Sequence, residues 1–478
     1  MLSCCLQAGA QTIRHITISG HQRTQRQTIE RELLFTAGAR LDSALLGETE
    51  RNLRRLPFLG KIAINIVPDG EFVDIEVRVQ DLYARALSPI FSGSLNALNY
   101  GLIAVDYNFA GRGRLARIAL EDRADRGPRG QISLSDPRLV GASHSAHIDL
   151  ALERDGHDLE WHFSHPYTTL STPRTYGIRQ WTNRTPRTYY EDGSARYQYA
   201  NTNEGMSLWY GISRGSNYKI RTLYEVRYAD RTVLASLTPQ PHFERQRRLQ
   251  QSATFTLWKP RFQRAQFIAN LGSVEDLQLG SWLSLRAGYA HAIDTADKSF
   301  TFFRANLSPR WSYRQVAYVF ATGSASWQHN GRGVENTYLL ADLRTYIRIS
   351  QSHSAAVRIR LDALHRPVPV DQLLLGLDTG LRAYSPHAFT GERRSMLSVE
   401  MRPTLIRTPW YVLAGAAFFD MGAAWNPPSN PFNLRSSAGL GLRVGLPKLY
   451  GTPVWRLDLA HAIRQHSWRL SVGVGQYF

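Results

Sequence analysis

Hydrophobic and polar residues alternate with a period of two along most of the chain, from residue 81 to residue 478. In one such segment, Ile148, Leu150 and Leu152 alternate with Asp149 and Glu153. The same pattern recurs at residues 116–121, 283–289, 342–349, 357–362, 455–459 and 468–474. Successive side chains of a strand point to opposite faces, so each segment predicts a strand with one apolar and one polar face.

Residues 13–80 have a different pattern, which is typical of a small α/β module. Alternation over residues 13–19 predicts a strand. Apolar residues at helical spacing predict one helix from about residue 26 to Gly38 and a second helix from about residue 42 to Pro57. Residues 61–67 and 71–79 flank a Pro-Asp-Gly turn and predict a hairpin. The expected order is strand, helix, helix, strand, strand.

Two architectures fit the alternating part of the chain: a soluble antiparallel sheet with one solvated face, or a membrane barrel with lipid outside and a polar lumen. Trp and Tyr residues near the strand ends favour the barrel, because aromatic girdles mark the two membrane interfaces. These residues are Trp161, Trp209, Tyr210, Trp282, Trp311, Trp410, Tyr411, Trp455 and Trp468. About 395 residues, at roughly 25 for each strand with its turn, predict around 16 strands. The predicted fold is therefore mainly β: a transmembrane antiparallel β-barrel of about 16 strands in residues 81–478, preceded by one small α/β domain in residues 13–80.

The net charge of +18 is carried almost entirely by residues 81–478, which account for +17. A positive charge of this size is compatible with binding to nucleic acid, anionic solutes or lipid phosphates. The sequence has no basic helix or aromatic-basic platform of a nucleic-acid-binding module. Inward-facing arginines such as Arg344, Arg348, Arg358 and Arg360 would make the lumen positive, and arginines on loops would contact lipopolysaccharide phosphates. An arginine-rich composition without a function of its own explains the charge equally well.

The first twelve residues contain both cysteines of the chain, Cys4 and Cys5, which are adjacent and too close for an ordinary disulfide. The segment has an apolar patch and an Ala-Gly-Ala sequence that resembles a cleavage site, but no basic start. We interpret residues 1–12 as the remnant of an export signal or as a disordered N-terminus. The longest apolar run, residues 410–419, is too short for a membrane-spanning helix.

Patterns that indicate catalysis are absent from the sequence or have a simpler explanation. Residues Gly211 to Gly215 fit the nucleophile motif G-x-S-x-G, but a predicted strand follows them where that motif requires a helix. We interpret these residues as a hairpin turn. The 15 histidines are scattered, and the chain has no H-E-x-x-H, phosphate loop or dinucleotide fingerprint. The sequence predicts no enzyme, no metal site and no cofactor.

Four sequence elements occur in the order and spacing of one known family. Residues 13–80, from Ile16-Thr-Ile-Ser-Gly20 to Val73-Asp-Ile-Glu-Val-Arg-Val79, resemble a POTRA domain. Leu381-Arg-Ala-Tyr384, followed by Gly391-Glu-Arg393, resembles the VRGY/F signature of an extracellular loop. Phe418-Phe-Asp-Met-Gly422 resembles an F-x-D-x-G strand element, and Ser471–Phe478 resembles a C-terminal insertion signal. Together they resemble a single-POTRA member of the BamA-like family of outer-membrane assembly and translocation proteins.

The resemblance implies that Arg382, on a loop that folds into the lumen, pairs with Asp420 of the barrel wall. Tyr384 would pack beside this pair, and Phe418 and Gly422 complete the strand motif. A bidentate Arg-carboxylate pair is stronger in a water-poor wall than at an exposed surface. The alternative is that Arg382 is one of many arginines on a solvated loop. Ala383 stands where the family usually has glycine, and it would be strained if that position requires φ > 0.

The last predicted strand contains Gly473 and Gly475 and leads to the terminal Phe478. Glycines weaken a strand ladder, and the resemblance implies that the first and last strands close the barrel with few hydrogen bonds and form a lateral gate. The alternative is that these glycines only make room for lumen side chains. The candidate residues of the seam and insertion signal are Ser471, Gly473, Gly475 and Phe478, although Gln476 departs from the usual apolar residue.

The resemblance also implies a function and a location: a bacterial outer-membrane barrel, with its POTRA domain in the periplasm, that inserts or translocates polypeptides. The POTRA domain would recruit an unfolded polypeptide client by pairing with an exposed sheet edge. The other expected partners are outer-membrane lipid, lipopolysaccharide and accessory periplasmic proteins or lipoproteins. Two alternatives stay open: a passive anion-selective porin, and a two-partner-secretion-type transporter for one dedicated exoprotein.

Overall fold

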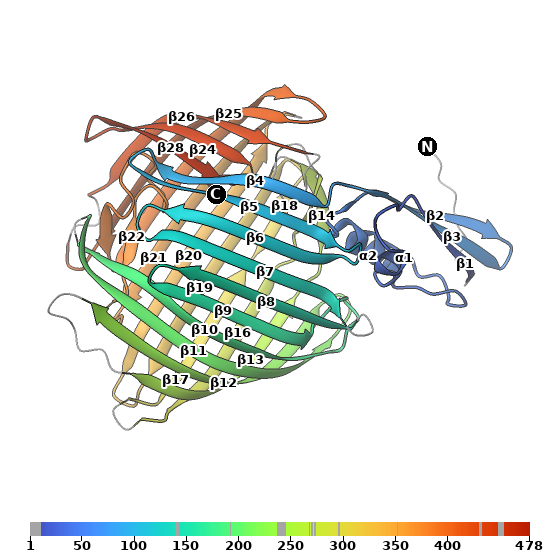
Figure 1. Cartoon of the computed structure of the whole chain (residues 1–478), viewed down its shortest axis with the longest axis horizontal. Coiled ribbons are helices and arrows are strands. Elements are labelled where there is room, and N and C mark those ends of the chain that lie inside the picture. Colours follow the sequence, from blue (N-terminus) through green and yellow to red (C-terminus); the bar gives the residue numbers. More distant parts are fainter. Residues whose placement is uncertain are drawn as a thin grey trace.

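The computed structural model consists of a small α/β module followed by a closed β-barrel (Figure 1). It describes residues 11–478 except 140–142, 192, 237–244, 267, 269–270, 272–273, 295–296, 351, 369, 430–432 and 448–453. The prediction for residues 1–12 falls almost entirely outside the described residues. No helix in the described ranges has the length and apolar character needed to cross a membrane.

The module has the predicted order of strand, helix, helix, strand and strand. Its elements are β1 (Thr12–Ser19), α1 (Arg26–Glu30), α2 (Ser43–Arg54), β2 (Leu59–Asp69) and β3 (Phe72–Asp81). The central strand β3 is parallel to β1 and antiparallel to β2, so β1 and β2 are the edges of the sheet. The inward positions of β3, Val73, Ile75 and Val77, pack against the helices in one buried core. The first helix is shorter than predicted and ends at Glu30.

The barrel closes through antiparallel pairs from the first strand to the last. Its first ten strands are β4 (Arg85–Ser94), β5 (Ala97–Phe109), β6 (Arg114–Arg123), β7 (Gly127–Leu139), β8 (His144–Glu153), β9 (Gly156–His165), β10 (Arg174–Glu191), β11 (Ser194–Arg214), β12 (Lys219–Ser236) and β13 (Gln246–Trp258). The others are β16 (Trp282–Ala292), β17 (Phe300–Ser308) with its continuation β18 (Arg310–Tyr313), β19 (Ala317–His329), β20 (Val334–Arg348), β21 (His353–His365), β24 (Arg393–Arg407), β25 (Val412–Trp425), β26 (Arg435–Gly445), β27 (Trp455–Ala462) and β28 (Ser467–Val474).

The prediction of about 16 strands is wrong, because the described barrel has 20. We count β17 and β18 as one strand, since both pair with β19 and only Pro309 separates them. The barrel extends from residue 85 to residue 474, an average of about 20 residues per strand instead of the roughly 25 assumed. Short connections cause the difference: only residues 95–96 join β4 to β5, and only residues 154–155 join β8 to β9.

The outer face of the barrel is apolar, as the alternation predicted. Ile118, Leu120, Leu361 and Leu459 are exposed by 52%, 62%, 52% and 44%. Their neighbours on the opposite face include Asp362, which is 4% exposed, and Asp458, which is 0% exposed. An apolar belt of this extent is unfavourable in water and suits a surface surrounded by lipid.

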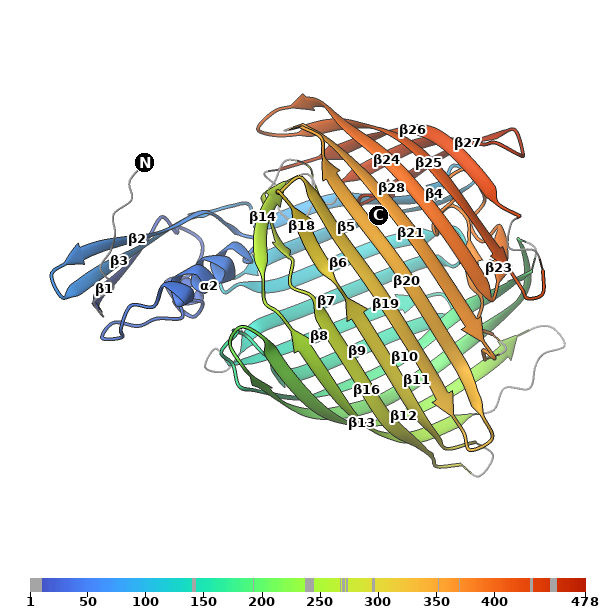
Figure 2. The same ribbon diagram turned by 180° about the vertical axis from the view of Figure 1, so that it is seen from behind.

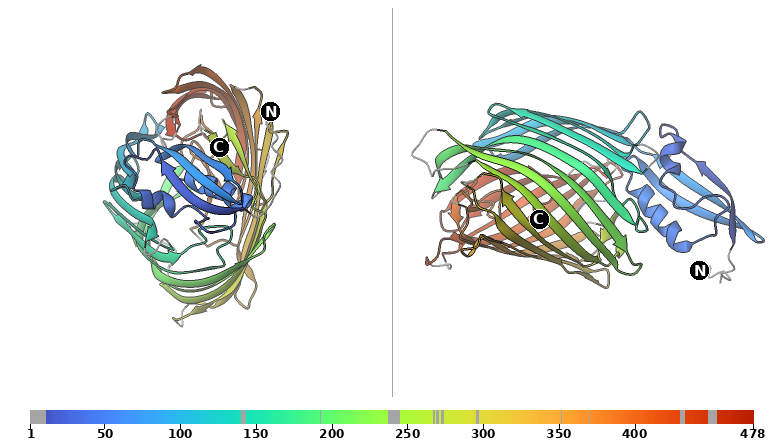
Figure 3. Two further views of the ribbon diagram at one scale, coloured as in Figure 1. Left: turned by 90° about the vertical axis from the view of Figure 1, so that its right-hand side faces the viewer. Right: turned by 90° about the horizontal axis from the view of Figure 1, so that it is seen from below.

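The α/β module is bound to one end of the barrel and lies in front of part of its opening (Figure 3). Arg138 of β7 donates to Glu32 at 2.7 Å, and the Leu170 amide donates to Glu48 at 2.6 Å. The Thr28 hydroxyl donates to the Gly111 carbonyl, in the turn between β5 and β6, at 3.0 Å. The contacts come from several separate turns of the barrel, so they define the orientation of the module.

A hairpin that the sequence did not predict lies at the end of the barrel that faces the module (Figure 2). Strands β14 (Phe262–Gln266) and β15 (Val274–Gln278) pair with each other outside the barrel sheet. Asp276 accepts a bond of 2.8 Å from Arg54 of α2. At the other end of the hairpin, Leu271 packs with Val412, Ala414 and Val454 at the ends of β25 and β27. The hairpin therefore extends across this barrel opening.

The carboxyl group of Asp81 closes the turn that leads from β1 into α1. It accepts hydrogen bonds from the amides of Gln22, Arg23 and Thr24 and from the Thr24 hydroxyl, at 2.5–3.2 Å. Burial raises the pKa of Asp81, but the Thr24 hydroxyl and the backbone amides lower it more, so the pKa lies below its ordinary value. A lowered aspartate pKa stabilises the fold above the ordinary value of about 4.

We expect the turn at residues 20–25 to lose protection progressively as the pH falls from about 4 through the lowered pKa of Asp81, where the folded carboxyl takes up a proton. Asp81→Asn removes the charge and should lower protection at neutral pH, leaving little further change on acidification. Hydrogen–deuterium exchange, corrected for its intrinsic pH dependence, measures both effects. Equal protection of the wild-type turn at pH 3 and pH 6 would contradict this role.

Candidate functional site

The loop between β21 and β24 folds into the barrel and carries the predicted Arg382. It contains a short hairpin of β22 (Leu373–Leu375) and β23 (Phe389–Gly391). Leu381 and Tyr384 on either side of Arg382 and Ala383 are 0% and 1% exposed. They pack with Phe418 of β25 in one buried cluster. The solvated-loop alternative for Arg382 is therefore wrong.

Arg382 forms the predicted contact with Asp420 of β25. Its Nε and one terminal nitrogen donate to the two carboxylate oxygens at 2.8 and 2.9 Å, which makes the pair bidentate. The guanidinium also lies 3.5 Å from the ring centre of Phe418 and 4.2 Å from that of Tyr477. Arg382 and Asp420 are both 0% exposed. Arg382 is thus held between two aromatic rings and a carboxylate, out of contact with bulk water.

The pair belongs to a larger set of charges, which we call the buried ion network: Arg382, Glu400, Arg402, Asp420, Arg443 and Asp458. Glu400 of β24 accepts from Arg382 at 2.5 Å, from Arg402 at 2.9 Å and from Arg443 at 3.2 Å. Arg443 of β26 also donates to Asp458 of β27 at 2.7 Å. All six side chains are at most 3% exposed. Glu400 has three cationic partners, whereas Asp420 has Arg382 alone among the described residues.

The other motif residues have steric roles around this pair. Ala383 has no positive φ, so the strain considered for it is absent; Gly380 has a φ of +139°. The Tyr384 hydroxyl donates to the Ser436 carbonyl at 3.2 Å, and its ring meets Phe389 edge to face. A Cβ at Gly422 would lie 2.6 Å from the Ser395 carbonyl oxygen, so this strand position has no room for a side chain.

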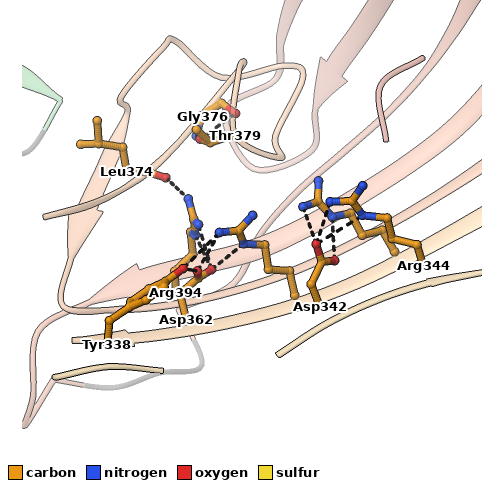
Figure 4. A network of polar contacts seen from close by, with 10 residues as sticks. Tyr338, Asp342, Arg344, Asp362, Leu374, Gly376, Thr379 and Arg394 are labelled. Atoms are coloured by element: carbon orange, nitrogen blue, oxygen red, sulfur yellow. Dashed lines mark hydrogen bonds and ion pairs between the residues drawn. The ribbon is translucent and has the colours of Figure 1, made fainter. Parts of the chain in front are cut away.

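A second set of ion pairs connects the same loop to the neighbouring wall (Figure 4). Asp362 of β21 accepts from Arg394 at 2.8 Å and from Tyr338 at 2.7 Å. Arg394 also donates to the Leu374 carbonyl of the loop at 2.7 Å. Asp342 accepts from both Arg344 and Arg358 at 2.9 Å. The predicted lumen arginines Arg344, Arg358 and Arg360 are thus paired with carboxylates, and this part of the wall is less positive than the sequence indicated.

The seam between the last and first strands is short. β28 and β4 pair at only two positions, Ser471 with Ser94 and Val472 with Gly93, whereas β27 and β28 pair at eight. A Cβ at Gly473 would lie 2.4 Å from Arg456 Nε, so this glycine makes room for a lumen side chain. At Gly473, therefore, the alternative interpretation applies, in which the glycine makes room for a side chain in the lumen.

The chain leaves the last strand before its terminal residues. β28 ends at Val474, and Gly475 has a φ of +89°, which turns the backbone away from the strand direction. The Tyr477 hydroxyl donates to the Leu377 carbonyl of the loop at 2.7 Å. Phe478 is 9% exposed, and its carbonyl accepts from Arg402 at 3.3 Å. The C-terminus thus packs against the loop and the buried ion network.

Sequence reasoning missed several residues of this site. Glu400, Arg443, Asp458 and Tyr477 contact Arg382 or its partners, but they lie in four different segments of the chain. The available signal is a charged residue among the polar positions of a predicted strand: Asp458 has it in the segment 455–459, whereas no strand was predicted around Glu400. The prediction of a hairpin turn over the G-x-S-x-G residues is only partly correct: residues 211–214 are the end of β11, and Gly215 alone of the five lies in the turn that leads into β12. The described residues contain no group of three or more side chains that could hold a metal ion.

Comparison with known proteins gives matches among solved structures only. No protein-family model matches the chain, and no curated protein matches it either. BamA from Haemophilus ducreyi lacking POTRA domains 1–3 matches with a TM-score of 0.47 and 14% identity, over 98% of this chain and 85% of that one. The chain is similar to BamA. It is also similar to CdiB from Acinetobacter baumannii (TM-score 0.45, 11% identity, 98% of this chain, 74% of that one) and CdiB from Escherichia coli (0.39, 11%, 100% and 92%).

Proposed function

We propose that this chain is a BamA-like barrel of the bacterial outer membrane that inserts or translocates polypeptides, with its α/β module, a POTRA domain, in the periplasm. The observation that carries the proposal is the seam. A closed barrel with an apolar outer face is held together at β4 and β28 by two residue pairs, and the adjoining C-terminus contacts a loop anchored in the lumen. A short ladder separates at low energetic cost, and the strand edges that it exposes can pair with a client strand.

The α/β module supports the recruitment step. Its sheet order leaves β2 as an edge strand, and Val67 on that strand is 54% exposed. An unfolded polypeptide can add to such an edge through backbone hydrogen bonds. A photoreactive residue at Val67 should capture the client in cells. The matched control is Phe72, which is 45% exposed but lies on the central strand β3, whose two edges are already paired.

Deletion of residues 13–80 tests the proposal. The barrel should still reach the outer membrane and migrate in a heat-modifiable way on gels, because its strands close on themselves without the module. Handling of the client captured at Val67 should fall to background. If the truncated barrel handles that client at full rate, the module is not the recruiting element. Recovery of the full chain as a soluble periplasmic protein would refute the membrane barrel itself.

The porin alternative lacks a specific observation in its favour. The loop with Arg382 occupies part of the lumen, and the β14–β15 hairpin extends across one opening. A passive porin requires an open aqueous channel through the barrel. A transporter for one dedicated exoprotein stays as the alternative function. A disulfide that joins β4 to β28 across the seam distinguishes it from a barrel that inserts its clients laterally.

A further inference from the structure

A cavity of about 1020 Å³ lies in the lumen, between the long strands of the barrel and the inserted loop. Its lining is rich in charge. The arginines are Arg126, Arg187, Arg227, Arg231, Arg286 and Arg304, and the carboxylates are Asp125, Asp155 and Asp371. Glu225, which is not itself a lining residue, accepts from Arg286 at 2.6 Å. With six arginines and four carboxylates in this described set, two positive charges have no matching negative charge.

The excess charge is concentrated where two strands place arginines face to face. Arg286 of β16 lies directly opposite Arg304 of β17 in the ladder. Like charges at directly opposite positions destabilise an antiparallel pair. Arg286 has Glu225 as a partner, but Arg304 has no ion pair with any described residue. The two facing arginines thus share one carboxylate partner among the described residues, and Arg304 is free to donate to a ligand.

The same barrel contains a matched case in which one carboxylate bonds to both facing arginines. Arg344 of β20 lies opposite Arg358 of β21, and both arginines bond to Asp342 at 2.9 Å. The carboxylate between the two guanidinium groups offsets their repulsion. The comparison indicates what the Arg286–Arg304 pair is missing: an oxyanion that accepts hydrogen bonds from both sides.

Arg227 of β12 places an unpaired hydrogen-bond donor, its Nε, at the same cavity. Its guanidinium lies 4.4 Å from the ring centre of Trp181, and its buried Nε has no hydrogen-bond partner. A buried donor without an acceptor is costly, and stacking on an aromatic ring restricts the orientation of the guanidinium. Four residues along the same strand, Arg231 lines the cavity and donates to Asn201 at 3.1 Å.

We propose that this cavity binds a phosphate group, with Arg304, Arg286 and Arg227 as its principal ligands. A phosphate dianion matches the two unmatched charges, and its oxygens accept the paired hydrogen bonds that guanidinium groups donate. The volume exceeds that of a phosphate ion and accommodates a phosphorylated sugar. The phosphate comes either from a free ion or, in the part of this inference that rests on the proposed outer-membrane function, from a phosphorylated glycan such as that of lipopolysaccharide.

Isothermal titration of the purified full chain in detergent tests the site, with inorganic phosphate and glucose 6-phosphate as the two probes. We expect saturable binding of at least one probe. Tighter binding of the sugar phosphate indicates the glycan source, and tighter binding of inorganic phosphate indicates the free ion. Arg304→Gln and Arg227→Gln should each weaken binding about 10- to 100-fold, the effect of losing one charge-assisted contact.

Arg344→Gln is the matched control, because it makes the same change in charge within the lumen but removes an arginine from Asp342. Its affinity should stay within about twofold of wild type. In the absence of a probe, the Arg304→Gln variant should unfold at a temperature no lower than that of the wild type, because the substitution removes a like-charge contact. An unfolding temperature in that range shows that the variant is folded. Absence of saturable binding, or an equal loss in Arg344→Gln, would overturn the proposal.

Discussion

Replacing Arg382 with alanine is expected to release the inserted loop from the lumen. Asp420 would then be a fully buried carboxylate without a cationic partner, whereas Glu400 would keep Arg402 and Arg443. Removing one partner of a buried ion pair typically costs about 3–5 kcal/mol, more than the pair itself contributes. Limited proteolysis between residues 376 and 390 should become much faster, and client handling should fall with it.

The second variant of this test is Asp420→Asn, which should cost less. It leaves Arg382 with Glu400, stacked between Phe418 and Tyr477. In the double variant no carboxylate is stranded, so its loss should not exceed that of Arg382→Ala alone. Such non-additivity is expected of residues that act through one contact. Simple addition of the two single losses would mean that Arg382 and Asp420 act independently.

Arg360→Ala is the control for loss of an arginine from the lumen wall. Arg360 pairs with Asp362, but that carboxylate keeps Arg394 and the Tyr338 hydroxyl. We therefore expect little change in protease sensitivity of the loop. Loop release in this variant as well would indicate that the loop responds to the overall lumen charge.

Joining the first and last strands by a disulfide is expected to abolish client insertion. Ser94 and Ser471 face each other in the two-residue seam, and directly opposite residues of antiparallel strands lie within disulfide range. The double substitution Ser94→Cys/Ser471→Cys, with Cys4 and Cys5 replaced by alanine, should lose activity under oxidising conditions and recover it after reduction. The physical reason is that a covalent bond prevents separation of the ladder.

Ser145→Cys/Ser164→Cys provides a matched control. These serines also face each other on neighbouring strands, β8 and β9, with hydroxyl oxygens 2.9 Å apart, but they lie in a ladder of nine residue pairs. Oxidation there should leave activity unchanged. Full activity of the oxidised seam variant would contradict a lateral route and favour passage through the lumen, as in a transporter for one dedicated exoprotein.

The local sequence pattern was sufficient to predict those structural features of this protein that depend on alternation and on neighbouring residues. The period-two pattern correctly predicted which face of each strand is apolar, because side-chain direction in a strand is a local property; Leu361 and Asp362 are an example. The order of elements in the α/β module followed from helical spacing and turn residues in the same way. The contact of Arg382 with Asp420 was predicted from motif resemblance and not from pattern, since 37 residues separate the two in the sequence.

The tertiary structure decided what depends on closure and on distant contacts. The number of strands is set by the lengths of the turns, which alternation does not encode, so 16 was predicted where 20 are present. The hairpin between Gln266 and Val274 leaves the barrel sheet, and Leu271 in it packs with Val412, Ala414 and Val454, which lie far away in the sequence. Likewise Glu400, Arg443 and Asp458 are isolated charges in the sequence. They become one buried network only because barrel closure brings their strands together around Arg382, where low exposure makes each charge depend on its partners.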